Sequence, residues 1–188
     1  MRAAWTAGAP LSDNELAALA AAGDTGAFET LAGRYQSLMY GVCRRITCND
    51  DDAVDALQES LIIMWQRIGS FEGRSAMGTW LFRIATNAAI DEVRRRARRP
   101  AQAYDEVLDR AGPDDVESAA VLRSTVDWAL GRLPPQFRAA VVLRENYDCS
   151  YQQIADILGI PLDTVKSRIS RGRQALADLL VPSYGSGD

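Results

Sequence analysis

The segment from residue 79 to residue 99 carries side chains that can hold nucleic acid. Trp80, Arg83, Asn87, Arg94 and Arg98 recur at helical spacing, so they share one face of the expected helix. Arg95 belongs to the same arginine-rich run, 94–99. Bases stack on aromatic rings and arginine holds the backbone, which is how proteins bind single strands. A plainer interpretation stays open, in which Trp80 packs in the core and the arginine run is merely solvated.

The stretch before this helix, residues 70–78, is rich in glycine and small polar residues. Small residues such as Ser75 allow the chain to approach a base closely, and Phe71 and Arg74 can line a pocket for a base that has left the stack. The alternative is that Phe71 only pins the stretch to the core.

Residues 151–180 predict a second nucleic-acid element. A short helix to Gly159, a tight turn and a longer helix from residue 162 form the pattern of a helix-turn-helix, whose second helix enters the major groove. The predicted DNA contacts on that helix are Thr164, Lys166, Ser167, Arg168, Arg171 and Arg173. We expect Arg168 and Arg173 to hold phosphates. A helical hairpin with a solvated basic face is the alternative.

The sequence lacks the residues that most enzymatic and metal-dependent chemistry needs. The 188-residue chain has no histidine, which removes the commonest general base, and its three cysteines show no CxxC spacing. We therefore expect reduced structural thiols, no metal, no cofactor, no small-molecule substrate and no enzymatic activity. The net charge of -4 argues against binding nucleic acid by overall charge, so any DNA contact must come from local basic patches.

Hydrophobic spacing predicts helices throughout, with no strand-like alternation. Ser12 and Glu15 have the spacing of a capping box at the start of a first helix, and residues 49–52 are expected as a turn before a third. On that third helix a buried stripe is expected at Val54, Leu57, Leu61, Met64, Trp65 and Ile68. The opposite face would then carry Asp55, Glu59, Ile63 and Gln66.

The chain divides into two small helical domains joined by a flexible linker, an all-α architecture. We expect a flexible N-terminus over 1–11, a first domain over 12–99, an acidic linker over 100–117, a second domain over 118–181 and a flexible tail over 182–188. No apolar stretch reaches the roughly 20 residues of a membrane-spanning helix. No signal peptide is visible either, so we expect a cytoplasmic protein without membrane insertion.

Several motifs, in order over both domains, resemble the extracytoplasmic-function sigma factors of bacterial RNA polymerase. The stretch 53–65, AVDALQESLIIMW, is similar to a helix of their region two. Residues 71–75 and 80–87, FEGRS and WLFRIATN, are similar to their promoter-melting segment. Residues 133–138 and 164–173, LPPQFR and TVKSRISRGR, are similar to their region four. Val54 departs from the family pattern, which often has an acid there.

The resemblance implies that the first domain docks on the clamp helices of core RNA polymerase and melts the −10 element. The second domain would contact the polymerase flap and read the −35 element, and catalysis would belong to the polymerase. The implied polymerase contacts are Asp55, Gln58, Glu59, Ile62, Ile63 and Gln66. A controlling anti-sigma factor is a further expected partner. Two alternative functions stay open: a stand-alone helix-turn-helix regulator, which would need only the second domain, and a nucleic-acid enzyme, which would need a metal or a base.

Overall fold

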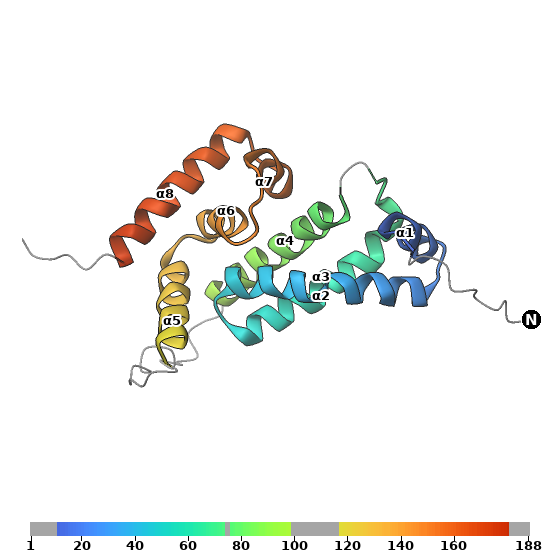
Figure 1. Ribbon diagram of the computed structural model, residues 1–188, viewed down its shortest axis with the longest axis horizontal. Helices are drawn as coiled ribbons and strands as arrows, with labels where there is room; N and C mark the ends of the chain where they lie inside the picture. The colour runs from blue at the N-terminus through green and yellow to red at the C-terminus, as the bar shows by residue number, and fades with distance from the viewer. Residues whose placement is uncertain (1–10, 74–75, 99–116, 181–188) are drawn as a thin grey trace, which may run out of the picture.

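The computed structural model describes residues 11–73, 76–98 and 117–180 (Figure 1). Within these ranges the chain forms eight α-helices and one short 3-10 helix, and no strand. The expected all-α fold is confirmed. The acidic linker expected at 100–117 lies outside the described residues except for Glu117, which begins a helix, and both expected flexible ends lie outside them almost entirely.

The first helical group is a bundle in which α2, α3 and α4 pack on one another and α1 closes one end. Its helices are α1 (Asp13–Ala21), α2 (Thr25–Thr47), α3 (Asp50–Arg67), the 3-10 helix η1 (Ile68–Ser70) and α4 (Met77–Arg98). The capping box predicted at Ser12 and Glu15 is present. Leu31, Ile46 and Leu81 are fully buried in the shared core.

The connection between α2 and α3 is shorter than the predicted turn over 49–52. Cys48 ends α2 in the left-handed conformation at φ 56°, and the Asn49 side chain caps α3 by accepting from the backbone of Asp52. Residues 50–52 are aspartates in the first helical turn, where the positive end of the helix dipole favours them. Their acidity therefore marks a helix start and not a loop.

The second helical group contains α5 (Glu117–Arg132), α6 (Pro135–Glu145), α7 (Tyr151–Leu158) and α8 (Leu162–Leu180). The turn predicted after Gly159 separates α7 from α8. Ser150 and Gln153 form a capping box at the start of α7, and Gly159 ends it in the left-handed conformation at φ 63°. The helix-turn-helix is therefore formed as the sequence predicts.

The second group packs directly against the first, with α6 against α2 and α4, and α7 against α4 (Figure 1). Leu130, Ala139 and Val142 of the second group belong to the same buried cluster as the core of the first. The rings of Phe82 and Tyr147 meet across the contact, with centroids 5.2 Å apart. The sequence analysis did not anticipate this shared core, and we call the packing the closed arrangement.

The buried face of α3 differs from the predicted one. Val54 and Trp65, expected in the core, are 42% and 43% exposed, whereas Ile63, expected on the outer face, is half-buried against the core. Leu57, Met64 and Ile68 are buried as predicted, and Leu61 packs partly buried against the core. Ala53, Ala56 and Ser60 are buried as well, because small side chains let α3 approach α2 and α4 closely. A pattern based on large hydrophobic residues alone therefore placed Val54, Trp65 and Ile63 on the wrong sides of the helix.

Candidate nucleic-acid and polymerase interfaces

A cleft of about 750 Å³ lies between the two helical groups. Trp80, Arg83, Asn87 and Arg94 of α4 line it, and so does Arg168 of α8. The structure thus confirms that these four α4 residues share one face. It also brings a residue predicted to contact the −35 element next to residues predicted to act at the −10 element.

Trp80 is not a free stacking surface in the closed arrangement. Its side chain is 8% exposed, and its ring packs on Phe71 with centroids 5.5 Å apart. Arg83 and Asn87 are exposed beside it. Arg74 and Ser75, the other residues predicted for the base pocket, lie outside the described residues.

The arginines at the end of α4 are largely held by protein partners. Arg94 pairs with Asp91 at 3.4 Å, and Arg98 donates from Nε to the backbone oxygen of Arg94 at 3.2 Å. Arg95 pairs with the buried carboxylate of Glu92, and this hydrogen bond raises the pKa of the guanidinium. All three arginines remain exposed. They present positive charge to solvent.

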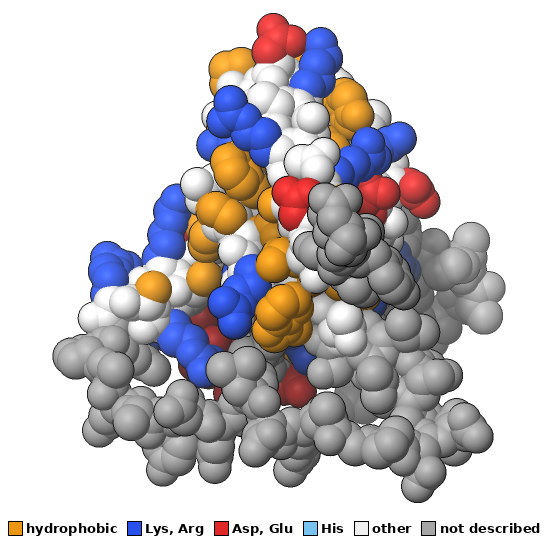
Figure 2. Space-filling view, turned by 90° about the vertical axis from the view of Figure 1, so that its left-hand side faces the viewer, with side chains coloured by type: hydrophobic (Ala, Val, Ile, Leu, Met, Phe, Trp, Pro, Cys, Tyr) orange, Lys and Arg blue, Asp and Glu red, His pale blue; other side chains and the backbone are white. Residues whose placement is uncertain are grey.

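The N-terminal half of α8 presents its predicted contacts outward. Lys166, Ser167 and Arg171 are exposed, whereas Thr164 and Arg168 are half-buried. Arg173 donates from Nε to Glu145 at 2.9 Å, which ties α8 to α6. Buried Val165, Ile169 and Gly172 form the inner face of α8. Figure 2 shows Lys and Arg side chains flanking hydrophobic ones on the side of the molecule that carries α5 and the end of α8.

The outer face of α3 combines acidic, amide and apolar side chains. Of the predicted polymerase contacts, five are exposed and Ile63 is not; the exposed ones are Asp55, Gln58, Glu59, Ile62 and Gln66. Ile62 is 51% exposed, and Val54 and Trp65 add further apolar surface. Exposed apolar side chains ringed by polar ones are typical of a protein interface.

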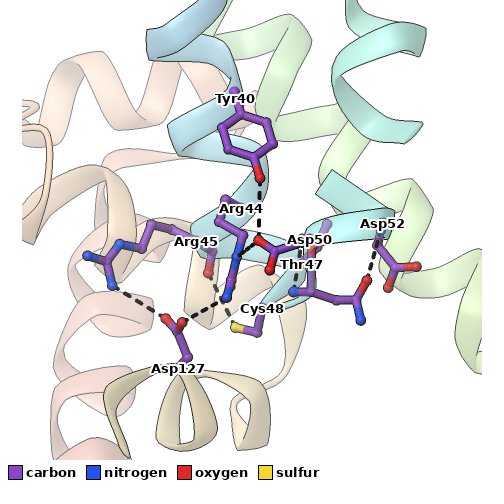
Figure 3. Close-up of polar contacts among 9 residues, drawn as sticks. Tyr40, Arg44, Arg45, Thr47, Cys48, Asp50, Asp52 and Asp127 are labelled. Atoms are coloured by element: carbon purple, nitrogen blue, oxygen red, sulfur yellow. Dashed lines mark hydrogen bonds and ion pairs between the residues drawn. The ribbon is translucent and has the colours of Figure 1, made fainter. Parts of the chain in front are cut away.

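Ion pairs join the two groups beyond the shared core. Asp127 of α5 pairs with Arg44 at 3.1 Å and with Arg45 at 3.4 Å, both from the end of α2. Figure 3 shows both arginines pointing toward this carboxylate. The sequence offered no local signal for these pairs, because Arg45 and Asp127 are 82 residues apart in the chain.

Arg138 of α6 is the other residue that the sequence analysis missed. It is 4% exposed, and it donates to the backbone oxygens of Gly131 and Leu133 at 2.7 and 3.1 Å. It also donates to the backbone oxygen of Ile46, at the end of α2. Burial lowers the pKa of this guanidinium. Arg138 therefore anchors the α5–α6 turn and the contact between the groups at once.

The surroundings of the three cysteine thiols disfavour the thiolate form. Burial raises the pKa of Cys43 to about 12 and also raises those of Cys48 and Cys149. In the described ranges no group of three potential metal ligands occurs. None of the helices described is long and apolar enough to cross a membrane.

Comparison with known proteins identifies the family to which the chain belongs. Residues 31–99 match the family Sigma-70 region 2, and residues 125–176 match Sigma-70, region 4. The chain is 34% identical to the ECF RNA polymerase sigma-E factor of Haemophilus influenzae, an alignment that covers 92% of this chain and 97% of that protein. The chain belongs to the ECF sigma factors. As a sigma factor it directs promoter-specific transcription initiation, and the region 2 match sets it apart from a stand-alone helix-turn-helix regulator.

Other relatives agree with this sigma-factor assignment. The chain is 37% identical to SigE of Mycolicibacterium smegmatis over 81% of its own length, and it spans 61% of that longer protein. Among solved structures, CnrH in complex with the cytosolic domain of CnrY aligns with a TM-score of 0.66 and 27% identity over 89% of this chain and 96% of CnrH. RpoE in complex with the anti-sigma factor NepR, from Bartonella quintana, aligns at 0.63 and 26%, over 81% and 96%.

Proposed function

We propose that this sigma factor reads the −35 element with the N-terminal half of α8. The observation that carries this proposal is the exposure of Lys166, Ser167 and Arg171 directly after the left-handed turn at Gly159. That geometry matches a recognition helix, whose first turns enter the major groove. Arg168 and Arg173, at the sides of this surface, would hold phosphates.

We further propose that the α4 face of Arg83 and Asn87 holds the opened −10 strand, with Arg94, Arg95 and Arg98 on the duplex upstream. Phe71 and Trp80, now packed on each other, would border the pocket for an unstacked base. Arg74 and Ser75 remain expected contributors to that pocket. The exposed amide of Asn87 and guanidinium of Arg83 support this assignment, because they are adjacent on the cleft wall.

Promoter binding on this scheme requires the two groups to separate. The −35 and −10 elements are about 25 base pairs apart, or roughly 85 Å at about 3.4 Å per base pair. Asn87 and Arg168 instead line the same cleft in the closed arrangement. The closed arrangement is therefore a form in which the two elements are not read together.

The outer face of α3 is the proposed docking surface for the polymerase clamp helices, and the second group would contact the flap. The polymerase supplies the catalytic chemistry, and the sigma factor itself is not an enzyme. It would act in the cytoplasm, where the polymerase is. An anti-sigma factor is a proposed partner, supported by the similarity to RpoE bound to NepR.

Run-off transcription with purified core polymerase tests the proposal. Wild-type protein should give specific transcripts from duplex promoter, and Asn87→Ala should lose promoter opening while retaining polymerase binding. A premelted template should restore transcription by the variant, because the base no longer has to leave the stack. Permanganate reactivity of unpaired thymines reports opening directly. A normal bubble formed by the variant on duplex DNA would remove Asn87 from the −10 assignment.

A further inference from the structure

The cleft between the two groups holds positive charge that the protein does not neutralise. Arg67, Arg83 and Arg168 line it, and none of their guanidinium groups has a hydrogen bond or ion pair to a residue in the described part of the chain. A fourth arginine of the cleft, Arg94, forms an ion pair with Asp91, which also lines the cleft. This concentration of charge stands in a protein whose net charge is -4.

The unpaired arginines come from both sides of the cleft. Arg67 ends α3 and Arg83 lies on α4, both in the first group, whereas Arg168 lies on α8 in the second. Like charges that line one cleft repel each other. The closed arrangement brings them together, so a multivalent anion in the cleft would stabilise that arrangement.

The walls of the cleft indicate what kind of anion fits. Its volume of about 750 Å³ lies in the range of small-molecule sites. Arginine binds phosphate well through its fork of donors. Leu158 and Ile160, both half-buried, give the cleft an apolar wall, with the buried Ile84 and Ile90 behind its floor. Asn87 adds an amide that can pair with a base edge. We propose that the closed cleft binds a free nucleoside polyphosphate, with its phosphates on the three unpaired arginines and its base on the apolar wall.

Such a ligand would regulate the sigma factor. A molecule that contacts both groups binds the closed arrangement better than a separated one, so it shifts the population toward the closed form. Promoter opening would then decrease, a consequence that rests on the proposed function, whereas the binding itself does not. A DNA strand offers the same phosphate chemistry, and the test must distinguish the two sources.

Isothermal titration of the full chain at low ionic strength, where charge screening is weak, provides the test. The probes are adenosine triphosphate, inorganic tripolyphosphate and a ten-nucleotide single strand, each titrated without polymerase or promoter. Adenosine triphosphate should bind several-fold more tightly than tripolyphosphate because of the apolar wall. Small-angle scattering should show the radius of gyration unchanged or lower with this ligand, because the ligand favours the closed form.

Substitutions on each side of the cleft locate the site. Arg83→Gln and Arg168→Gln should each weaken binding of adenosine triphosphate about tenfold, the loss expected for one hydrogen-bonded charge contact. Arg96→Gln, on the same helix as Arg83, and Arg132→Gln, in the second group, remove arginines that do not line the cleft. Both controls should stay within about twofold of wild type.

The proposal would be overturned if only the single strand bound, or if tripolyphosphate bound as tightly as adenosine triphosphate. It would also be overturned if the cleft variants and the control variants lost the same affinity for adenosine triphosphate. A scattering profile that expands with ligand would also contradict it. Because no promoter enters these measurements, a failed run-off assay would leave this inference standing. Normal transcription without nucleotide binding would remove this inference alone.

Discussion

The guanidinium of Arg95 lies 3.2 Å from the carboxylate of Asp55, so a predicted DNA contact on α4 is paired with a predicted polymerase contact on α3. Both side chains are about half exposed, at 50% and 54%. An exposed pair of this kind contributes about 0–1 kcal/mol to stability. Its interest is therefore functional, because docking on polymerase through Asp55 would leave Glu92 as the carboxylate partner of Arg95.

Asp55→Asn tests this coupling. We expect weaker binding to core polymerase, a free energy of unfolding within about 1 kcal/mol of wild type, and no loss of affinity for promoter duplex by the free protein. Asp51→Asn, an exposed position in the same helix with no ion pair to the described residues, is the control. Equal polymerase affinity for both variants in a fluorescence titration would exclude Asp55 from the interface.

The corrected face of α3 gives a matched pair of adjacent isoleucines. Ile62→Glu should weaken polymerase binding at least tenfold with an unchanged thermal transition, because its side chain is 51% exposed. Ile63→Glu should instead lower the free energy of unfolding by about 1–3 kcal/mol, because it buries a charge against the core. Calorimetry and a pull-down separate the two effects. If Ile63→Glu abolished docking and kept full stability, the originally predicted face would be the right one.

The contact between the groups can be loosened at one glycine. A Cβ on Gly41 of α2 would lie 2.7 Å from the hydroxyl of Tyr147, whereas a Cβ on Gly33 of the same helix would meet nothing. Gly→Ala in a helix stabilises by about 0.5–1 kcal/mol through the backbone. Gly33→Ala should show that gain, and Gly41→Ala should lose it and open the closed arrangement.

Small-angle scattering measures this opening as an increase in the radius of gyration of Gly41→Ala alone. Because Tyr147 is packed on Phe82, its ring cannot move away without disturbing the contact. Identical scattering from the two alanine variants would show that the Tyr147 contact does not hold the groups together.

Asp13 links α1 to α2 with a defined pH dependence. It accepts from the Tyr35 hydroxyl and pairs with Arg34 at 2.9 Å, and the Tyr35 hydrogen bond is the main cause that lowers the pKa of Asp13. A lowered carboxyl pKa contributes stability above the unfolded value, which is lost as the pH falls through the folded value. Tyr35→Phe should therefore cost about 1 kcal/mol at neutral pH, and less in acid.

The alkaline side follows from the tyrosine itself. Burial, with Asp13, raises the pKa of Tyr35 from 10.0 to about 12, so its contribution is complete below pH 10 and is lost between the two values. Urea unfolding across pH 3–11 checks the acid loss and the first part of the alkaline loss. Tyr40→Phe removes a longer hydrogen bond, 3.3 Å to the exposed Asp50, and should change stability less. A pH-independent difference for Tyr35→Phe would contradict this linkage.

Two substitutions in the proposed recognition helix α8 should affect sequence preference and salt dependence separately. Arg171→Ala should reduce discrimination among −35 sequences by about 1–3 kcal/mol, the value of a good base contact. Arg168→Ala should weaken binding to all sequences alike and lower the salt slope by about 1. Competition binding over a range of salt concentrations measures both. Wild-type preference and salt dependence in both variants would show that α8 is not the reader.

Local signals predicted most of the helices, because caps and breaks act within a few residues. Ser12 and Gly159 fixed helix ends that the structure reproduces. The prediction for α3 was right at Leu57, Met64 and Ile68 but wrong at Val54 and Trp65, because Ala53 and Ser60 are core residues of low hydrophobicity. The closed arrangement could not be predicted, since the Arg138 hydrogen bond to Ile46 joins residues 92 positions apart with no periodic pattern between them.

The core shared by the two groups also makes the stability of the closed arrangement depend on temperature. Leu130, Ala139 and Val142 would meet water when the groups part, and newly wetted apolar surface raises the heat capacity. The enthalpy of parting therefore changes with temperature, and its equilibrium constant follows a curved van't Hoff plot. Cooling and warming by the same interval would shift the balance between the two forms by unequal amounts, so this sigma factor carries a temperature response in its apolar packing.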